Sequence, residues 1–223
     1  MPTLELSQST LRWIEQPRPA WRGVLHRFAA PVSVVAGTWL VTTAPALRSQ
    51  LAIGAFAASM TVMFTVSAVV HHRRWPPHLT EILLRADHTA IYLAIAGSAC
   101  AIALLGLDGW QRTVLLLWSL GFAAVGVFVE WLPFAPGRGF SNTMYLAMSW
   151  PTIALVPWLY ENEGWATVVL LAVGGVFYTV GAIIVALRRP DPAPEVFGYH
   201  EVWHLLVVAA ATAHYAMMWT LLR

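Results

Sequence analysis

The chain has 223 residues, of which 58% are hydrophobic and 11% are charged, and its formal net charge is +2. A soluble domain carries about 25% charged residues, so this composition excludes an ordinary water-soluble domain and indicates an integral membrane protein. The sequence contains no basic domain with interleaved aromatic residues, so we expect membrane lipids as partners and no nucleic acid.

Residues 1–27 are predicted to form a cytoplasmic N-terminal tail, because this segment is polar, carries arginines and lacks the apolar core of a signal peptide. Residues 28–223 are predicted to form one membrane domain. Its apolar runs are each long enough to cross about 30 Å of hydrocarbon as a helix. We therefore predict an all-α bundle of seven transmembrane helices, at residues 28–47, 51–71, 86–107, 113–132, 142–160, 165–187 and 199–222.

The orientation of the bundle is predicted from arginine alone, because the chain has no lysine. With the N-terminus inside, the cytoplasmic segments hold ten arginines and the opposite segments hold three. Positive residues are enriched in cytoplasmic loops, so the N-terminus is predicted inside and the C-terminus outside. We expect the protein in the cell membrane, which is the inner membrane if the source is bacterial.

This orientation brings ionisable side chains from three helices to the cytoplasmic face. The second span ends with Ser67 and His71, the third begins with Asp87, and the seventh begins with His200 and His204. Each pair four residues apart shares one helix face. Three histidines plus a water are typical of a catalytic Zn²⁺ site, with Asp87 orienting the water and Ser67 binding the water or a substrate carbonyl. The alternative is a set of polar side chains that hydrogen-bond between helices.

Four motifs in chain order resemble those of a known family. They are Ser67-x-x-x-His71, residues 87–97 (DHTAIYLAIAG), residues 174–182 (GGVFYTVGA) and residues 197–204 (FGYHEVWH). Together they resemble the hemolysin III family of the progestin and adiponectin receptor superfamily. The resemblance implies seven helices and an intramembrane zinc ion bound by His71, His200 and His204, with Asp87 and Ser67 close to the bound water. The superfamily is similar to membrane ceramidases, which implies hydrolysis of a lipid amide or ester, and bacterial members imply a role in membrane homeostasis.

Two other functions are compatible with these residues. His200, Glu201 and His204 match the HExxH pattern of zinc proteases, in which the glutamate is the general base. The third protease ligand is missing at the expected distance, so we interpret Glu201 as a supporting or interfacial carboxylate. A non-enzymatic membrane sensor or receptor-like protein would hold a structural zinc. Direct binding of zinc by Ser67 or Asp87 would close the site and favour that function.

Overall fold

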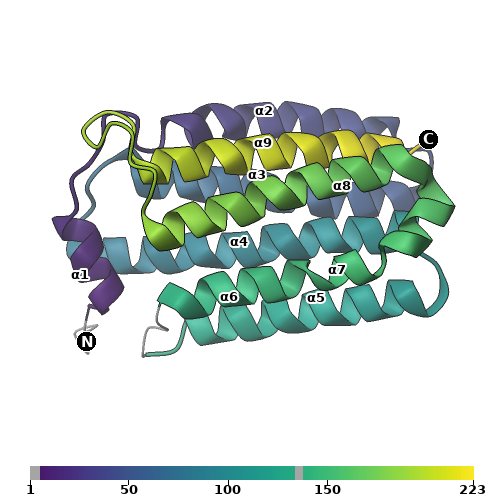
Figure 1. Cartoon of the computed structure of the whole chain (residues 1–223), viewed down its shortest axis with the longest axis horizontal. Coiled ribbons are helices and arrows are strands. Elements are labelled where there is room, and N and C mark those ends of the chain that lie inside the picture. Colours follow the sequence, from purple (N-terminus) through teal and green to yellow (C-terminus); the bar gives the residue numbers. More distant parts are fainter. Residues whose placement is uncertain (1–5, 134–137) are drawn as a thin grey trace.

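The structure is a computed structural model, which describes residues 6–133 and 138–223. These residues are almost entirely helical (Figure 1). The helices are α1 (Gln8–Glu15), α2 (Val24–Thr43), α3 (Leu47–His72), α4 (Pro77–Gly106), α5 (Gly109–Glu130), α6 (Arg138–Ser149), α7 (Pro151–Ala154), α8 (Val156–Leu187) and α9 (Tyr199–Thr220).

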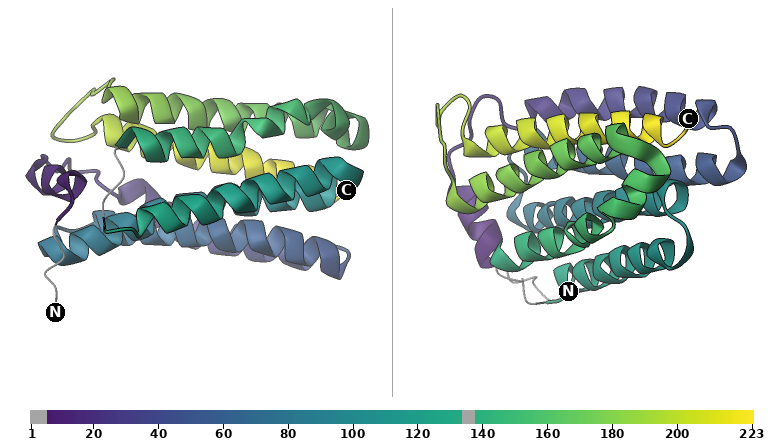
Figure 2. Two further views of the ribbon diagram at one scale, coloured as in Figure 1. Left: turned by 90° about the horizontal axis from the view of Figure 1, so that it is seen from below. Right: turned by 45° about the vertical axis from the view of Figure 1, so that its right-hand side comes forward.

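The long helices lie side by side along one axis, as Figures 1 and 2 show. Helix α3 packs against both α2 and α4, and α9 packs against α8 and α2. The core between them contains side chains such as Ile53, Phe56, Met60 and Met217, each at most 2% exposed. Many other large apolar side chains are exposed on the outer faces of the helices. Exposed apolar surface of this extent marks contact with lipid.

Six helices, α2, α3, α4, α5, α8 and α9, are long and apolar enough to cross a membrane. They coincide with six of the predicted spans, so the predicted all-α membrane fold is confirmed. Helix α4 begins at Pro77, well before the predicted start at residue 86. Proline fits the first turn of a helix because its missing N–H has no partner there. The added turns carry Glu81 and Arg85 into the helix.

The predicted fifth span, residues 142–160, is not one helix. It consists of α6, α7 and the first turn of α8. Pro151 begins α7, and Pro157 is the second residue of α8. The segment still runs the length of α4. The Tyr145 hydroxyl donates to the His88 carbonyl at 3.4 Å, and the Asn162 amide donates to the Gly106 carbonyl at 3.0 Å.

The stretch of α4 between these two contacts rises about 27 Å, which is close to the thickness of the hydrocarbon core. At Gly164, which has a φ of 75°, the chain turns into the main part of α8. A left-handed backbone of this kind favours glycine. The geometry supports a seventh crossing, and the count of seven stays a prediction.

The N-terminal segment folds back onto one end of the bundle. Helix α1 contacts α4, and the backbone N–H groups of Ala20 and Trp21 donate to the carbonyls of Glu195 and Val196 in the α8–α9 loop at 2.9 and 3.0 Å. The same end holds the end of α3 and the starts of α4 and α9 (Figure 1). The segment that the sequence predicted as a tail therefore covers the end of the bundle where the predicted site lies.

We expect reporter fusions to place the N-terminus in the cytoplasm and both Glu161 and the C-terminus on the opposite side. Arginines are more numerous in the segments predicted to be cytoplasmic. The segment that contains α6 and α7 would supply the additional crossing that places Glu161 and the C-terminus on the opposite side. An alkaline phosphatase reporter should be active at Glu161 and at the C-terminus, and a fluorescent reporter should be bright at the N-terminus. A C-terminal fusion that reports a cytoplasmic position would leave only six crossings and contradict the prediction.

Candidate metal centre

Three histidines converge at this end of the bundle. His71 lies in the last turn of α3, whereas His200 and His204 lie on successive turns at the start of α9. One ring nitrogen from each lies within 4.8 Å of the other two. His71 and His204 are 2% and 3% exposed. The structure thus brings together the three histidines that the sequence analysis selected, and these residues could hold a metal ion.

The spacing of two of the nitrogens fits a single tetrahedral ion. The Nε2 atoms of His71 and His200 are 3.4 Å apart. Two nitrogens bound at 2.0–2.1 Å with a tetrahedral angle between them lie about 3.3–3.4 Å apart. The centroids of the three rings are 4.6–4.8 Å apart, so no ring blocks another from a common centre. Imidazole nitrogens suit several divalent transition metals.

Asp87 and Ser67 lie beside the histidines. The Asp87 Oδ2 atom is 3.9 Å from the His71 Nε2 atom. Ser67 lies one turn before His71 in α3, is 3% exposed, and interacts with the Asp87 side chain. A carboxylate and a hydroxyl therefore face the same region next to the imidazoles, where they can orient a water molecule or a polar substrate group.

Glu201 is engaged at both carboxylate oxygens. Its Oε1 atom accepts from the Arg22 Nε–H at 2.6 Å, and its Oε2 atom accepts from the Gly198 N–H at 3.0 Å. The second contact caps the N-terminus of α9, where a negative charge is favourable. Glu201 is 2% exposed. A carboxylate held in this way supports the start of α9 and is poorly placed to act as the base of a HExxH protease.

The N-terminal segment covers the histidine cluster from outside the bundle. The Trp13 ring centroid lies 5.0 Å from that of His71 and 5.7 Å from that of His200. The Arg22 guanidinium lies 5.3 Å from the Trp13 ring centroid. Gly23 has a φ of 75°, and a Cβ atom added there would lie 2.6 Å from the His71 Cβ atom. Sequence reasoning missed these contacts because no local motif marks Trp13 or Arg22.

His26 is a further residue that sequence reasoning assigned to the tail. It lies in the first turn of α2, is 2% exposed, and its ring stacks on His204 with a centroid separation of 3.9 Å and an interplanar angle of 12°. It also contacts Phe64 edge to face at 5.1 Å. His26 therefore fixes the plane of the His204 ring. His26 is buried because α2 already begins at Val24 and includes His26 in its first turn.

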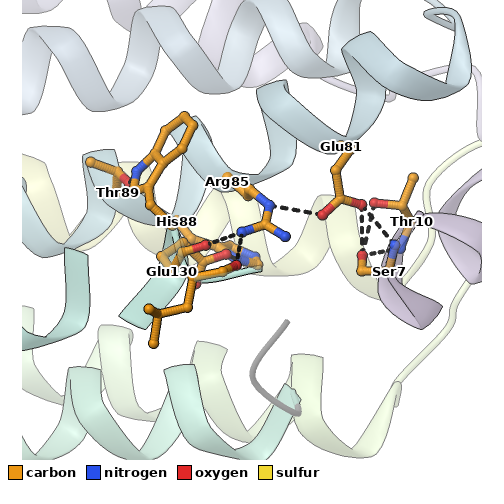
Figure 3. A network of polar contacts seen from close by, with 9 residues as sticks. Ser7, Thr10, Glu81, Arg85, His88, Thr89 and Glu130 are labelled. Atoms are coloured by element: carbon orange, nitrogen blue, oxygen red, sulfur yellow. Dashed lines mark hydrogen bonds and ion pairs between the residues drawn. The ribbon is translucent and has the colours of Figure 1, made fainter. Parts of the chain in front are cut away.

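A second polar network lies on α4 next to the site (Figure 3). Glu130, the last residue of α5, is 5% exposed, and its Oε1 atom is 2.9 Å from the His88 Nδ1 atom. Arg85 donates to the Glu130 carbonyl at 2.6 Å and to the Glu81 carboxylate at 2.8 Å. Glu81 accepts from the Ser7 hydroxyl at 2.7 Å. The network joins α1, α4 and α5.

Comparison with known proteins gives concordant matches. Residues 14–215 match the family model described as Haemolysin-III related, and this range contains all three histidines. The chain is 30% identical over 196 residues to Hemolysin-3 of Bacillus cereus, with 84% of each chain covered. It is 31% identical over 164 residues to Hemolysin-3 homolog of Bacillus subtilis strain 168, with 71% of each covered. With six apolar helices, these matches show a multi-pass protein of the cell membrane.

The purified protein should contain about one equivalent of a divalent metal per chain, because the three imidazoles converge on one point. Replacing His71, His200 or His204 by alanine should lower the metal content measured by elemental analysis. His78→Ala is the matched control, because His78 is exposed. Full metal content in the triple alanine variant would exclude this site.

Gly23→Ala should weaken metal binding although Gly23 offers no ligand. The new methyl group would meet His71 and would also strain a left-handed backbone. Changes in groups that orient metal ligands typically lower metal affinity by about 10–100-fold. Competition with a chromogenic chelator measures the change. Gly54→Ala is the control, because an added Cβ atom there has no neighbour within 4 Å. Equal affinity in the two variants would contradict the proposed contact.

Proposed function

The chain belongs to the haemolysin III-related family, and we propose that it is a zinc-dependent membrane hydrolase. Its substrate would be a lipid amide or ester, as in ceramidases, and its role would be in membrane homeostasis. The observation that carries the proposal is the composition of the metal-binding group. In the part of the chain that the structure describes, the group contains His71, His200 and His204 and no carboxylate or thiol. Three protein ligands leave one tetrahedral position for water, which is typical of catalytic zinc.

When bound, zinc would polarise the scissile carbonyl and lower the pKa of water to about 7. Asp87, whose Oδ2 atom is 3.9 Å from the His71 Nε2 atom, would take the proton from the attacking water and deliver it to the leaving amine or alcohol. Ser67 can donate a hydrogen bond to the substrate carbonyl. The hydroxyl group of water then ends on the acyl carbon and its proton on the leaving group.

The position of the site supports a lipid substrate. The histidines lie at the end of α3 and the start of α9, both of which are membrane-spanning candidates. The amide and ester bonds of lipids lie at the same level, between the hydrocarbon core and the headgroups. Many apolar side chains on the outer faces of the bundle give a lipid a surface along which to approach.

The alternative is a non-enzymatic sensor with a structural zinc. That function needs a closed site with four protein ligands. Asp87 is the nearest candidate for the fourth ligand, since its Oδ2 atom is 3.9 Å from the His71 Nε2 atom. X-ray absorption spectroscopy of the zinc-loaded protein separates the two functions, because the enzyme requires three nitrogen ligands and a water oxygen that an inhibitor such as a hydroxamate displaces.

Asp87→Asn should keep most of the metal and lose most of the turnover of a lipid amide or ester. The amide cannot take a proton from water, and a positioned acid–base group contributes about 10²–10⁴-fold in rate. Mass spectrometry of a lipid panel incubated with the zinc-loaded protein measures turnover. Asp108→Asn is the matched control, because the Asp108 side chain is 84% exposed.

Glu201→Gln completes this test, since it removes the charge that the protease mechanism requires. We expect it to impair the packing of the N-terminal segment and to retain more turnover than Asp87→Asn, because Glu201 is bound by Arg22 and Gly198. Loss of turnover in Glu201→Gln with full turnover in Asp87→Asn would assign the base to Glu201 and refute the role of Asp87.

A further inference from the structure

A small cavity lies beneath the N-terminal segment, on the cytoplasmic side of the metal centre. Its volume is about 60 Å³, and its walls include Trp13, Arg18, Arg22, His71, Arg73 and Arg74. One water molecule needs about 10–15 Å³ by this measure of volume. The cavity therefore has room for a polar group of several atoms, such as a tetrahedral oxyanion.

The walls of this cavity carry an excess of positive charge. Of its four arginines, Arg22 pairs with the Glu201 carboxylate at 2.6 Å. Among the residues that the structure describes, Arg18, Arg73 and Arg74 form no ion pair with a carboxylate. Burial, followed by the charges of neighbouring arginines, lowers the pKa of the Arg18 guanidinium, which lies outside the membrane-spanning helices. Three guanidinium charges are thus left without compensation around one small space.

Neutral groups hold these guanidinium groups in place. Arg18 donates to two backbone carbonyls at the end of α3, one of them that of His71, at 2.6 and 2.5 Å. Arg74 donates to two carbonyls in the N-terminal segment at 3.1 and 3.5 Å. The Arg73 guanidinium lies 4.0 Å from the centroid of the Trp75 ring. These contacts orient the arginines and leave their positive charges free to bind an anion.

We propose that this cavity binds a phosphate group and that the bound phosphate holds the N-terminal segment over the metal centre. Guanidinium groups form bidentate, charge-assisted hydrogen bonds with phosphate. Phosphate is favoured over a carboxylate because three uncompensated cations match a group with up to two negative charges. The phosphate would bridge Arg18 of the N-terminal segment and the Arg73–Arg74 pair of the α3–α4 loop.

The phosphate can come from an anionic lipid headgroup or from the cytoplasm. The cavity lies at the ends of membrane-spanning helices, where headgroups lie, and the cytoplasmic leaflet is rich in anionic lipids. Trp13 and Trp75 flank the arginines, and tryptophan is enriched at the same level of the bilayer. Both sources present the same phosphate oxyanion. Competition between the lipid and inorganic phosphate for the site distinguishes them.

The test compares two pairs of neighbouring arginines predicted to face the same leaflet. Both pairs are exposed: Arg73→Gln/Arg74→Gln removes two charges that line the cavity, and Arg188→Gln/Arg189→Gln removes two charges after α8 that do not line it. The full-length proteins are purified in a maltoside detergent that contains no phosphate. Native mass spectrometry then measures binding of phosphatidic acid, with and without inorganic phosphate as a competitor. Thermal melting and metal content confirm that each variant is folded.

We expect Arg73→Gln/Arg74→Gln to weaken binding of phosphatidic acid by at least about tenfold, the usual effect of losing a hydrogen bond to a charged group. The Arg188→Gln/Arg189→Gln control should stay within about twofold, the range of an exposed charge. Competition by millimolar inorganic phosphate would assign the site to free phosphate, and its absence would assign the site to the headgroup. Equal weakening in both pairs, or none in either, overturns the proposal, because binding would then follow net charge alone.

Hydrogen exchange provides the second readout. The backbone of residues 13–22 should exchange more slowly when phosphatidic acid is bound to the wild-type protein, because the phosphate joins this segment to the α3–α4 loop. Arg18→Gln should remove this protection and leave metal content unchanged. Binding of phosphatidic acid without any change of exchange in this segment would refute the holding role.

Discussion

The ion pair between Arg22 and Glu201 joins the two ends of the chain at the metal centre. Both side chains are buried, and the contact is 2.6 Å long. Removing one partner of such a pair leaves an uncompensated buried charge, which costs about 3–5 kcal/mol. Glu201 lies between His200 and His204 in sequence, so the ion pair also fixes the turn of α9 that carries two of the three histidines. The ion pair therefore links the N-terminal segment directly to the helix that carries two of the histidines.

Around this contact, the polar groups at this end of the bundle form a nearly continuous system. Arg22 stacks on Trp13, Trp13 contacts His71 and His200, and His26 stacks on His204. On the opposite side, Asp87 is followed by His88, which Glu130 holds. Charged and polar groups are costly within a bilayer and persist where they pair with one another. The pairing holds these charged and polar groups together at one end of the bundle.

Hydropathy predicted the membrane fold because burial in lipid demands long apolar helices, which leave a strong local pattern. The convergence of His71, His200 and His204 was also predictable, since alternating helices return the chain to the same face. Residues with no local pattern were missed. The contact between Arg22 and Glu201, for example, joins positions far apart in sequence. The single helix predicted for residues 142–160 is broken at Pro151 and Pro157, because each proline lies in the first turn of a new helix.

The short pieces α6 and α7 also bear on how the chain enters the membrane during synthesis. A 12-residue helix containing Ser141 and Asn142 is too short and too polar to partition into lipid alone. Helix α8 follows immediately, has 32 residues and contains an 18-residue stretch with a mean hydropathy of 2.5. An insertion machinery that releases segments singly would leave α6 and α7 in the channel until α8 emerged. The α6–α7 segment and α8 would then enter the membrane together as one helical hairpin, with the turn at Gly164 at its tip.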